Sequence, residues 1–159
     1  MSKTGAPEAQ RVDGTGVDVV IVAATWHAQI MDGLIAGAQR ALEAAGARHR
    51  LVRVPGSFEL ALAAQSAFAG GADAVVALGV IIRGGTPHFE YVSAATTDGL
   101  NRVALDAGRP VGFGVLTLDD EEQGLDRAGL PGSQEDKGAE AADAALRMVE
   151  VLRTAAPTA

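Results

Sequence analysis

The segment at residues 79–91 contains the residues best suited to chemistry. An apolar run leads into Gly84 and Gly85, which place no Cβ atom near an approaching ligand. Thr86 is predicted to be the N-cap of a helix whose next residue is proline. Free backbone N–H groups at a helix N-terminus bind anions, and His88 beside them can move protons near neutral pH. The segment therefore predicts chemistry on a small phosphorylated molecule.

Regular elements must position this segment. Apolar runs predict strands, helical spacing of apolar residues predicts helices, and the two kinds alternate along the chain. The predicted strands are residues 17–24, 51–54, 74–82 and 110–116, and the predicted helices are residues 28–45, 58–69, 87–107, 120–128 and 134–153. Such alternation predicts an α/β fold, with a parallel sheet, right-handed crossovers and helices on both faces.

This topology also predicts where a ligand binds. In open α/β sheets the site lies beyond the carboxyl ends of the strands. Residues 25–27, 56–59, 84–88 and 116–120 all fall at that edge. Taken alone, the tryptophan of the first segment would be a packing residue, the glutamate of the second a favourable charge at a helix start, and the histidine of the third a solvated side chain. Their convergence on one edge favours a functional site.

Composition sets the outer limits. The chain has 159 residues, enough for one domain, which we place at residues 17–154, with a flexible C-terminus at 155–159. The formal net charge of −7 argues against nucleic-acid binding, and no apolar run is long enough to predict a membrane span. Residues 1–16 are polar and lack an export pattern, which predicts a disordered tail and a cytoplasmic protein.

Several specific chemistries lack their sequence patterns. There is no cysteine, and the three histidines lack metal-ligand spacing, so no metal site is predicted. No Gly-x-Gly-x-x-Gly follows the first predicted strand, and no Walker loop is present, which argues against a dinucleotide or P-loop fold. Ser57 stands in Gly-Ser-Phe-Glu, which is not a nucleophile elbow.

Four separated motifs, in order, carry a resemblance to a known family. They are Pro-Gly-Ser-Phe-Glu at residues 55–59, the run at 77–89, Gly-Val-Leu-Thr at 114–117 with Glu-Gln at 122–123, and Asp-Arg-Ala-Gly at 126–129 with Asp-Lys-Gly at 136–138. From about residue 17 to residue 152 the chain resembles lumazine synthase of riboflavin biosynthesis. The resemblance implies a flavodoxin-like, three-layer sandwich around a four-stranded parallel sheet, in agreement with the alternation of elements.

The resemblance also implies a reaction without a cofactor. Lumazine synthases condense 5-amino-6-(D-ribitylamino)uracil with 3,4-dihydroxy-2-butanone 4-phosphate, giving 6,7-dimethyl-8-ribityllumazine, phosphate and water. His88 is the implied proton carrier. The residues implied to bind the pyrimidine and its ribityl chain are Trp26, Ser57, Phe58, Glu59, Val80, Ile81, Ile82, Phe113 and Lys137, and those implied to bind the phosphate are Gly84, Gly85, Thr86 and Arg127.

Three of these residues are expected to act on another copy of the chain. In the family, active sites lie between subunits, and the residues matching Phe113, Arg127 and Lys137 come from the adjacent subunit. Without the resemblance, they would be a strand residue of the core, a surface ion pair and a solvated charge. The connection at residues 128–136 is longer than in relatives that build icosahedral shells, so we predict a homopentamer. Riboflavin synthase is a further expected partner.

Two other functions stay open at this point. One is a non-catalytic protein that binds lumazine or flavin, or serves as an assembly scaffold. The joint presence of His88, Arg127 and Lys137 favours the enzyme, because ring binding alone needs only Trp26 and the ribityl-binding turn. The other is a flavodoxin-like electron carrier, which is disfavoured because its anion loop would follow the first strand.

Overall fold

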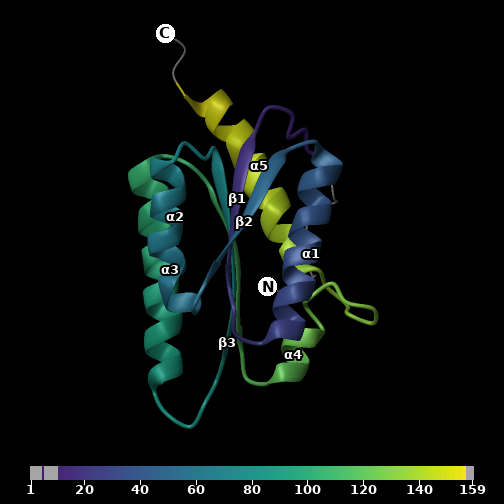
Figure 1. Ribbon diagram of the computed structural model, residues 1–159, viewed down its shortest axis with the longest axis vertical. Coiled ribbons are helices and arrows are strands. Elements are labelled where there is room, and N and C mark those ends of the chain that lie inside the picture. The colour runs from purple at the N-terminus through teal and green to yellow at the C-terminus, as the bar shows by residue number, and fades with distance from the viewer. Residues whose placement is uncertain (1–4, 6–10, 157–159) are drawn as a thin grey trace.

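The computed structural model describes Gly5 and residues 11–156. Four strands form one parallel sheet in the order β2-β1-β3-β4, and a helix layer covers each face (Figure 1). The strands are β1 (Asp18–Ala24), β2 (Arg48–Val54), β3 (Ala74–Ile82) and β4 (Val111–Leu118). The predicted α/β class, with its flavodoxin-like sheet and three layers, is confirmed.

Two apolar cores hold the helices to the sheet. One lies under α1 (Ala28–Ala45), α4 (Glu121–Leu125) and α5 (Lys137–Ala155). The other lies under the short 3-10 turn η1 (Ser57–Glu59), α2 (Leu60–Ala69) and α3 (His88–Ala107). Figure 1 shows these two layers on opposite sides of the sheet. Because β1 and β3 are central and covered on both sides, their residues are almost all apolar and buried.

The edge strand β2 begins three residues earlier than predicted, at Arg48 rather than Leu51. The prediction was wrong there because Arg-His-Arg is too polar to indicate a strand. At the edge of a sheet, exposed charged side chains are ordinary, and they discourage pairing with another strand. Arg48 uses its charge locally, in a two-point ion pair with Asp18 on β1.

Helix ends follow local capping chemistry. Helix α1 ends at Gly46, whose φ of 76° is the left-handed conformation predicted for that glycine. Asp136 caps α5 by accepting from the N–H of Ala139, so this helix starts three residues later than predicted. Thr86 was wrongly predicted as the cap of α3. Pro87 occupies the cap position with helical φ and ψ, and no side chain bonds to the exposed N–H groups.

The described residues reach beyond the predicted domain at both of its ends. Residues 1–4, 6–10 and 157–159 lie outside the described residues, as does most of the predicted tail at 1–16. The end of that tail is packed, contrary to the prediction, because Val12 is buried and the Gly14 N–H donates to the Ala45 carbonyl at 2.8 Å. At the other end α5 continues to Ala155. No helix in the described part of the chain has the length and apolar character needed to cross a membrane.

Candidate active site

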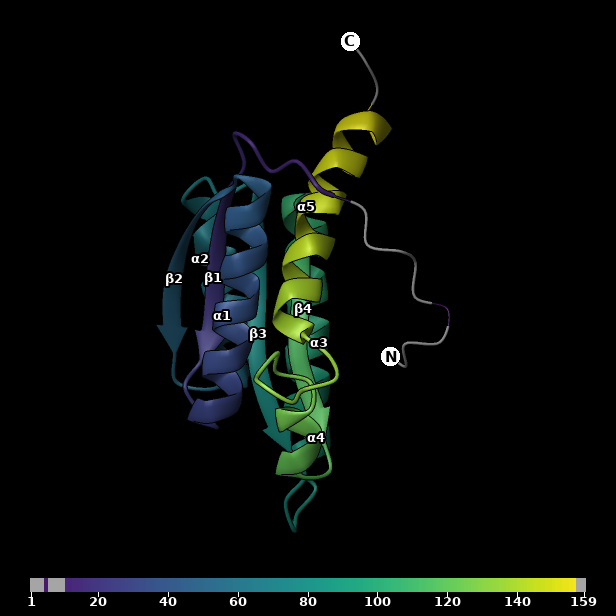
Figure 2. The same ribbon diagram turned by 90° about the vertical axis from the view of Figure 1, so that its right-hand side faces the viewer.

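All four strands point the same way, so their carboxyl ends meet at one edge of the sheet (Figure 2). An open pocket of about 880 Å³ lies there. It is lined by the loop after β1, the turn after β2, the end of β3 and the start of α3. Three of the four segments predicted to converge therefore do so. The fourth, at residues 116–120, does not line this pocket.

Trp26 forms one wall of the pocket. Its side chain is 67% exposed, so it is not the packing residue that a lone tryptophan usually is. The Thr25 hydroxyl donates to the Pro55 carbonyl at 2.7 Å, which ties the loop after β1 to the turn after β2. A Cβ at Gly56 would lie 3.2 Å from the Glu59 carboxylate and 3.7 Å from the Trp26 indole nitrogen, so both groups lie beside this glycine. The arrangement presents a flat aromatic face beside a carboxylate.

Ser57 is held inside the turn that follows β2. Its carbonyl accepts a hydrogen bond from the Thr96 hydroxyl of α3 at 3.2 Å. Its own hydroxyl is buried against Gly79 of β3, and it has no hydrogen-bond partner in the described part of the chain. Any side chain at Gly79 would meet that hydroxyl. Phe58, next in the turn, is 64% exposed at the pocket wall.

The end of β3 offers backbone groups to the pocket. Pairing with β1 stops at Leu78, whereas pairing with β4 continues to Ile82. Residues Val80, Ile81 and Ile82 line the pocket on the side that β1 has left. Peptide groups that face this side have no strand partner, so they can pair with the polar edge of a planar ring.

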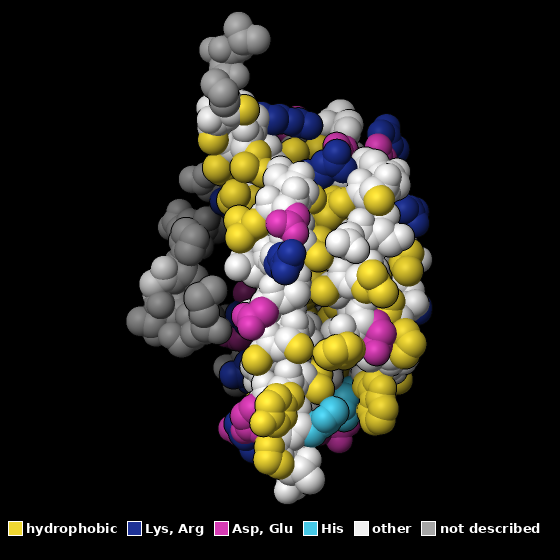
Figure 3. Space-filling view, turned by 90° about the vertical axis from the view of Figure 1, so that its left-hand side faces the viewer, with side chains coloured by type: hydrophobic (Ala, Val, Ile, Leu, Met, Phe, Trp, Pro, Cys, Tyr) yellow, Lys and Arg dark blue, Asp and Glu magenta, His cyan; other side chains and the backbone are white. Residues whose placement is uncertain are grey.

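His88 is the first residue of α3 and lines the pocket, and its side chain has no hydrogen-bond partner in the described part of the chain. Tyr91, Val92 and Ala95 follow on the same face of the helix and also line the pocket. None of these three was predicted from the sequence, although their spacing of three, four and seven residues from His88 is typical of one helix face. Figure 3 shows histidine side chains between groups of apolar side chains at this end of the molecule.

His27 belongs to the predicted segment at residues 25–27, but it was not named as a candidate site residue. It lines the same pocket with a φ of 58°, the only left-handed residue other than glycine in the described part of the chain. Such a conformation is unfavourable for a side chain with a Cβ, and histidine is among the residues that tolerate it best. The strand-end rule placed its segment at this edge but did not single out His27, because a strand-to-helix junction imposes no residue type.

Arg83 directly precedes the glycine pair, and its side chain ties this loop to two neighbouring elements. It pairs with Glu90 on α3 and with Asp119 after β4, at 3.1 Å for the latter, and lies over the Phe89 ring at 4.2 Å. The hydrogen bond from Arg83 holds the pKa of Glu90 below its ordinary value. The segment at 116–120 therefore supports the loop instead of lining the pocket.

The anion loop has open space but lacks a cation. Gly84 and Thr86 line the pocket, Gly85 does not, and a Cβ at either glycine would meet no atom within 4 Å. Among the described residues that line this pocket, the charged or titratable side chains are Glu59, two histidines and Tyr91, with no lysine or arginine. Arg83, the cation next to this loop, is already paired with Glu90 and Asp119. Among the described residues, a phosphate bound in this pocket would therefore meet no cation of its own chain that is not already paired with carboxylates.

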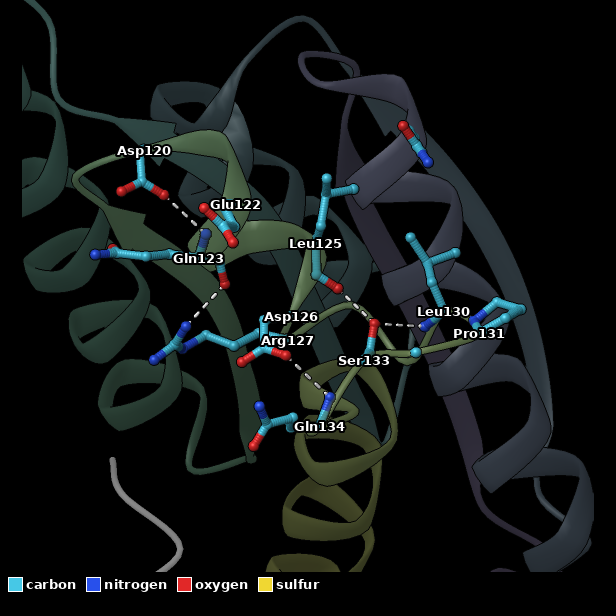
Figure 4. A pocket seen from close by; sticks show the side chains of 12 residues that line it. Asp120, Glu122, Gln123, Leu125, Asp126, Arg127, Leu130, Pro131, Ser133 and Gln134 are labelled. Carbon is cyan, nitrogen blue, oxygen red and sulfur yellow. Dashed lines mark hydrogen bonds between the residues drawn. The ribbon is translucent and has the colours of Figure 1, made fainter.

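Arg127 lies at a different pocket, formed by α4 and the following loop (Figure 4). Its guanidinium donates through Nη1 to the Gln123 carbonyl at 2.8 Å. The volume is about 600 Å³, and the lining includes Asp120, Glu122 and Asp126. One arginine among three carboxylates makes a poor phosphate site within this chain.

Lys137 and Phe113 are also absent from the first pocket. Lys137 is the first residue of α5, where it pairs with Glu140 at 2.7 Å. Burial alone would lower its pKa, but the hydrogen bond to Glu140 and then the ion pair with Glu135 outweigh this and raise it. Phe113 lies on the edge strand β4 and is 46% exposed, so it is not the core residue that its strand position indicated. Within a single chain, Phe113, Arg127 and Lys137 therefore lie apart from the other eleven candidates, which are at the first pocket or its glycine loop.

Comparison with known proteins gives concordant matches. The family model described as 6,7-dimethyl-8-ribityllumazine synthase matches residues 16–153. A 6,7-dimethyl-8-ribityllumazine synthase from Leifsonia xyli is 73% identical, with 96% of this chain and 98% of that protein covered. Proteins of the same name from Clavibacter sepedonicus (63%; 96% and 97% covered) and Kineococcus radiotolerans (61%; 99% and 98% covered) are also similar.

Proposed function

The chain belongs to the 6,7-dimethyl-8-ribityllumazine synthase family, and we propose that its active site is the pocket lined by Trp26 and His88, completed by a neighbouring copy. The enzyme condenses 5-amino-6-(D-ribitylamino)uracil with 3,4-dihydroxy-2-butanone 4-phosphate in riboflavin biosynthesis. The products are 6,7-dimethyl-8-ribityllumazine, phosphate and water. Both substrates are small molecules.

The pyrimidine binds between Trp26 and the end of β3 in this proposal. Stacking on the exposed indole suits a flat heteroaromatic ring. The peptide groups of Val80, Ile81 and Ile82 that lack a strand partner read the polar edge of the ring. The ribityl chain lies along the turn at residues 57–59, where the Glu59 carboxylate meets its hydroxyl groups. The Ser57 hydroxyl is buried against Gly79, so Ser57 contributes by shaping this turn. Phe58 supplies apolar contact beside it.

The butanone phosphate binds at Gly84, Gly85 and Thr86, next to the uncapped start of α3. His88 then moves protons as the amine adds to the ketone, as phosphate leaves and as the second ring closes. Its exposed side chain has no competing partner in the described part of the chain. Holding both reactants in one pocket removes the entropy of their encounter.

The missing cation is the observation that carries the proposal of a shared site. The described lining of the first pocket holds no lysine or arginine, and the nearby Arg83 is paired with two carboxylates. Arg127 lies at another pocket, beside carboxylates of its own. Arg127 of a neighbouring copy clamps the phosphate, for which its planar fork is suited. Phe113 and Lys137 of that neighbour contact the pyrimidine and its ribityl chain.

We propose a homopentamer as the assembly. Exposed apolar side chains on α5 and on the edge strand β4 support association, since a monomer rarely leaves such patches uncovered. The connection at residues 128–136 supports a small ring over an icosahedral shell. Riboflavin synthase, which uses the lumazine, and a cytoplasmic location remain predictions from the sequence.

Two measurements test these statements together. Incubating the purified protein with both substrates should produce the absorbance of 6,7-dimethyl-8-ribityllumazine above the uncatalysed background. Absence of any acceleration would contradict the active site proposed here. Sedimentation should give five chains of 16.1 kDa, a total of about 80 kDa. A monomer or a sixty-chain shell would overturn the pentamer.

A further inference from the structure

The loop that joins α4 to α5 folds back on itself. Ala128 and Asp136 form an antiparallel bridge, and the Gly129 N–H donates to the Glu135 carbonyl at 2.9 Å. On the next pair, the Lys137 N–H donates to the Arg127 carbonyl, also at 2.9 Å. The backbone therefore holds the two cationic residues side by side, although ten positions separate them in sequence.

Glu135 faces both cations with the same oxygen. Its Oε2 lies 3.3 Å from the Lys137 ammonium nitrogen and 3.8 Å from the Nε of Arg127. The Glu135 side chain is only 12% exposed, and this oxygen is buried without a well-directed hydrogen bond in the described part of the chain. A carboxylate loses much hydration on burial, so it is retained in such a place only where nearby cations compensate.

Each cation also has a second partner of its own. Arg127 donates to the Gln123 carbonyl, and Lys137 pairs with Glu140, whose side chain is 54% exposed. These outer partners restrain one cation each. Glu135 is the charged group that restrains both.

We propose that Glu135 is a positioning residue for the neighbouring active site. It sets the distance and direction between Arg127 and Lys137, so that the two cations enter the neighbour's pocket as a pair. One then meets the phosphate and the other the pyrimidine substrate. This inference rests on the proposed shared site, and it gives Glu135 no contact with either substrate.

The test uses Glu135→Gln, which keeps the size of the side chain and removes its charge. Loss of the shared charge should raise KM for both substrates by about tenfold, with kcat changed less than about threefold. The matched control is Glu140→Gln, which removes an exposed partner of the same lysine and should change either KM by less than about twofold. Values for Glu135→Gln within twofold of wild type, or a loss confined to kcat, would overturn the inference.

A double-mutant cycle separates positioning from a structural role. Arg127→Ala should raise KM for the phosphorylated substrate, and adding Glu135→Gln to it should raise that KM no further, because Glu135 acts through Arg127. A full additional effect would overturn the inference. If Arg127→Ala leaves this KM unchanged, the shared site itself is wrong; if Arg127→Ala raises it and Glu135→Gln does not, only the role of Glu135 fails.

A second variant serves as a control in case Glu135→Gln fails to fold. Glu135→Asp keeps the negative charge and withdraws the oxygen by one methylene, so it should fold even where the glutamine variant does not. It should raise both KM values by an intermediate factor, at an unchanged melting temperature. Wild-type KM values in a folded Glu135→Asp protein would contradict a need for this geometry.

Discussion

The backbone N–H of Lys137 donates to the carbonyl of Arg127 at 2.9 Å, so the loop between α4 and α5 presents two cations from one place. That place is not the pocket of the same chain, where lysine and arginine are missing from the described lining. Within one subunit, the ligand-binding pocket and the two cations that would neutralise the phosphate thus lie in different places. Association of identical subunits in a ring would bring each half to its complement.

Trp26 is the only tryptophan of the chain, which makes its fluorescence a direct report on the pocket. Adding the pyrimidine substrate should quench it, because the indole stacks on the ring. Trp26→Ala should weaken pyrimidine binding by ~1–3 kcal/mol, the range for stacking of a base on an aromatic side chain, whereas Trp26→Phe should stay near wild type. Unquenched fluorescence at saturating substrate would exclude stacking.

His88 should affect turnover more than binding. His88→Ala is expected to lower kcat by ~10–10²-fold, at the low end for general acid–base groups, since these reactants condense readily. Affinity for a product analogue should be nearly unchanged. His49→Ala is the matched control, because His49 lies on β2 beside Glu43 and outside the pocket. Steady-state rates equal to wild type in His88→Ala would remove His88 from the mechanism.

The Arg83–Glu90 pair behind the anion loop should titrate at low pH. Its hydrogen bond holds the pKa of Glu90 below the ordinary value of 4.5. Because the folded value is the lower one, the pair's contribution is present above pH 4.5 and is lost as pH falls through the folded pKa. Carbon-13 NMR of the Glu90 carboxyl, assigned with Glu90→Gln, should show this depressed midpoint. Arg83→Met should return it to the ordinary range.

A close helix contact offers a stability test. Gly138 at the start of α5 lies against the backbone of Leu34 on α1, so a Cβ there would overlap it. Gly138→Ala should therefore lower the free energy of unfolding by ~1–3 kcal/mol through overpacking. Gly85→Ala is the control, because a Cβ at that position meets open space. Equal melting temperatures for the two variants would contradict the close packing of α1 on α5.

The fold was predictable from the sequence where patterns are local. The apolar runs of β1 and β3 and the helical spacing of α1 identify buried elements, and Gly46 ends α1 as its residue type indicates. The polar start of β2 was not predicted because an edge strand needs no apolar pattern. Thr86 was misassigned because the helix begins at His88, one residue later than predicted, which puts Pro87 at the cap position.

The candidate site was predictable in part. The strand-end rule correctly groups Trp26, Glu59 and His88 at one pocket, because parallel strands end at one edge of the sheet. Glu135 could not be found in this way. Its importance depends on a loop that folds back and on burial between two cations, and neither leaves a pattern in sequence.

The most direct test of a shared active site mixes two inactive proteins. One carries Trp26→Ala with His88→Ala, and the other carries Arg127→Ala with Lys137→Met. After co-expression, about a quarter of the interfaces in a random ring combine an intact pocket with an intact neighbouring loop. The mixed rings should therefore regain roughly a quarter of wild-type activity, while each variant alone stays inactive. Mixed rings no more active than the separate variants would contradict a site built from two chains.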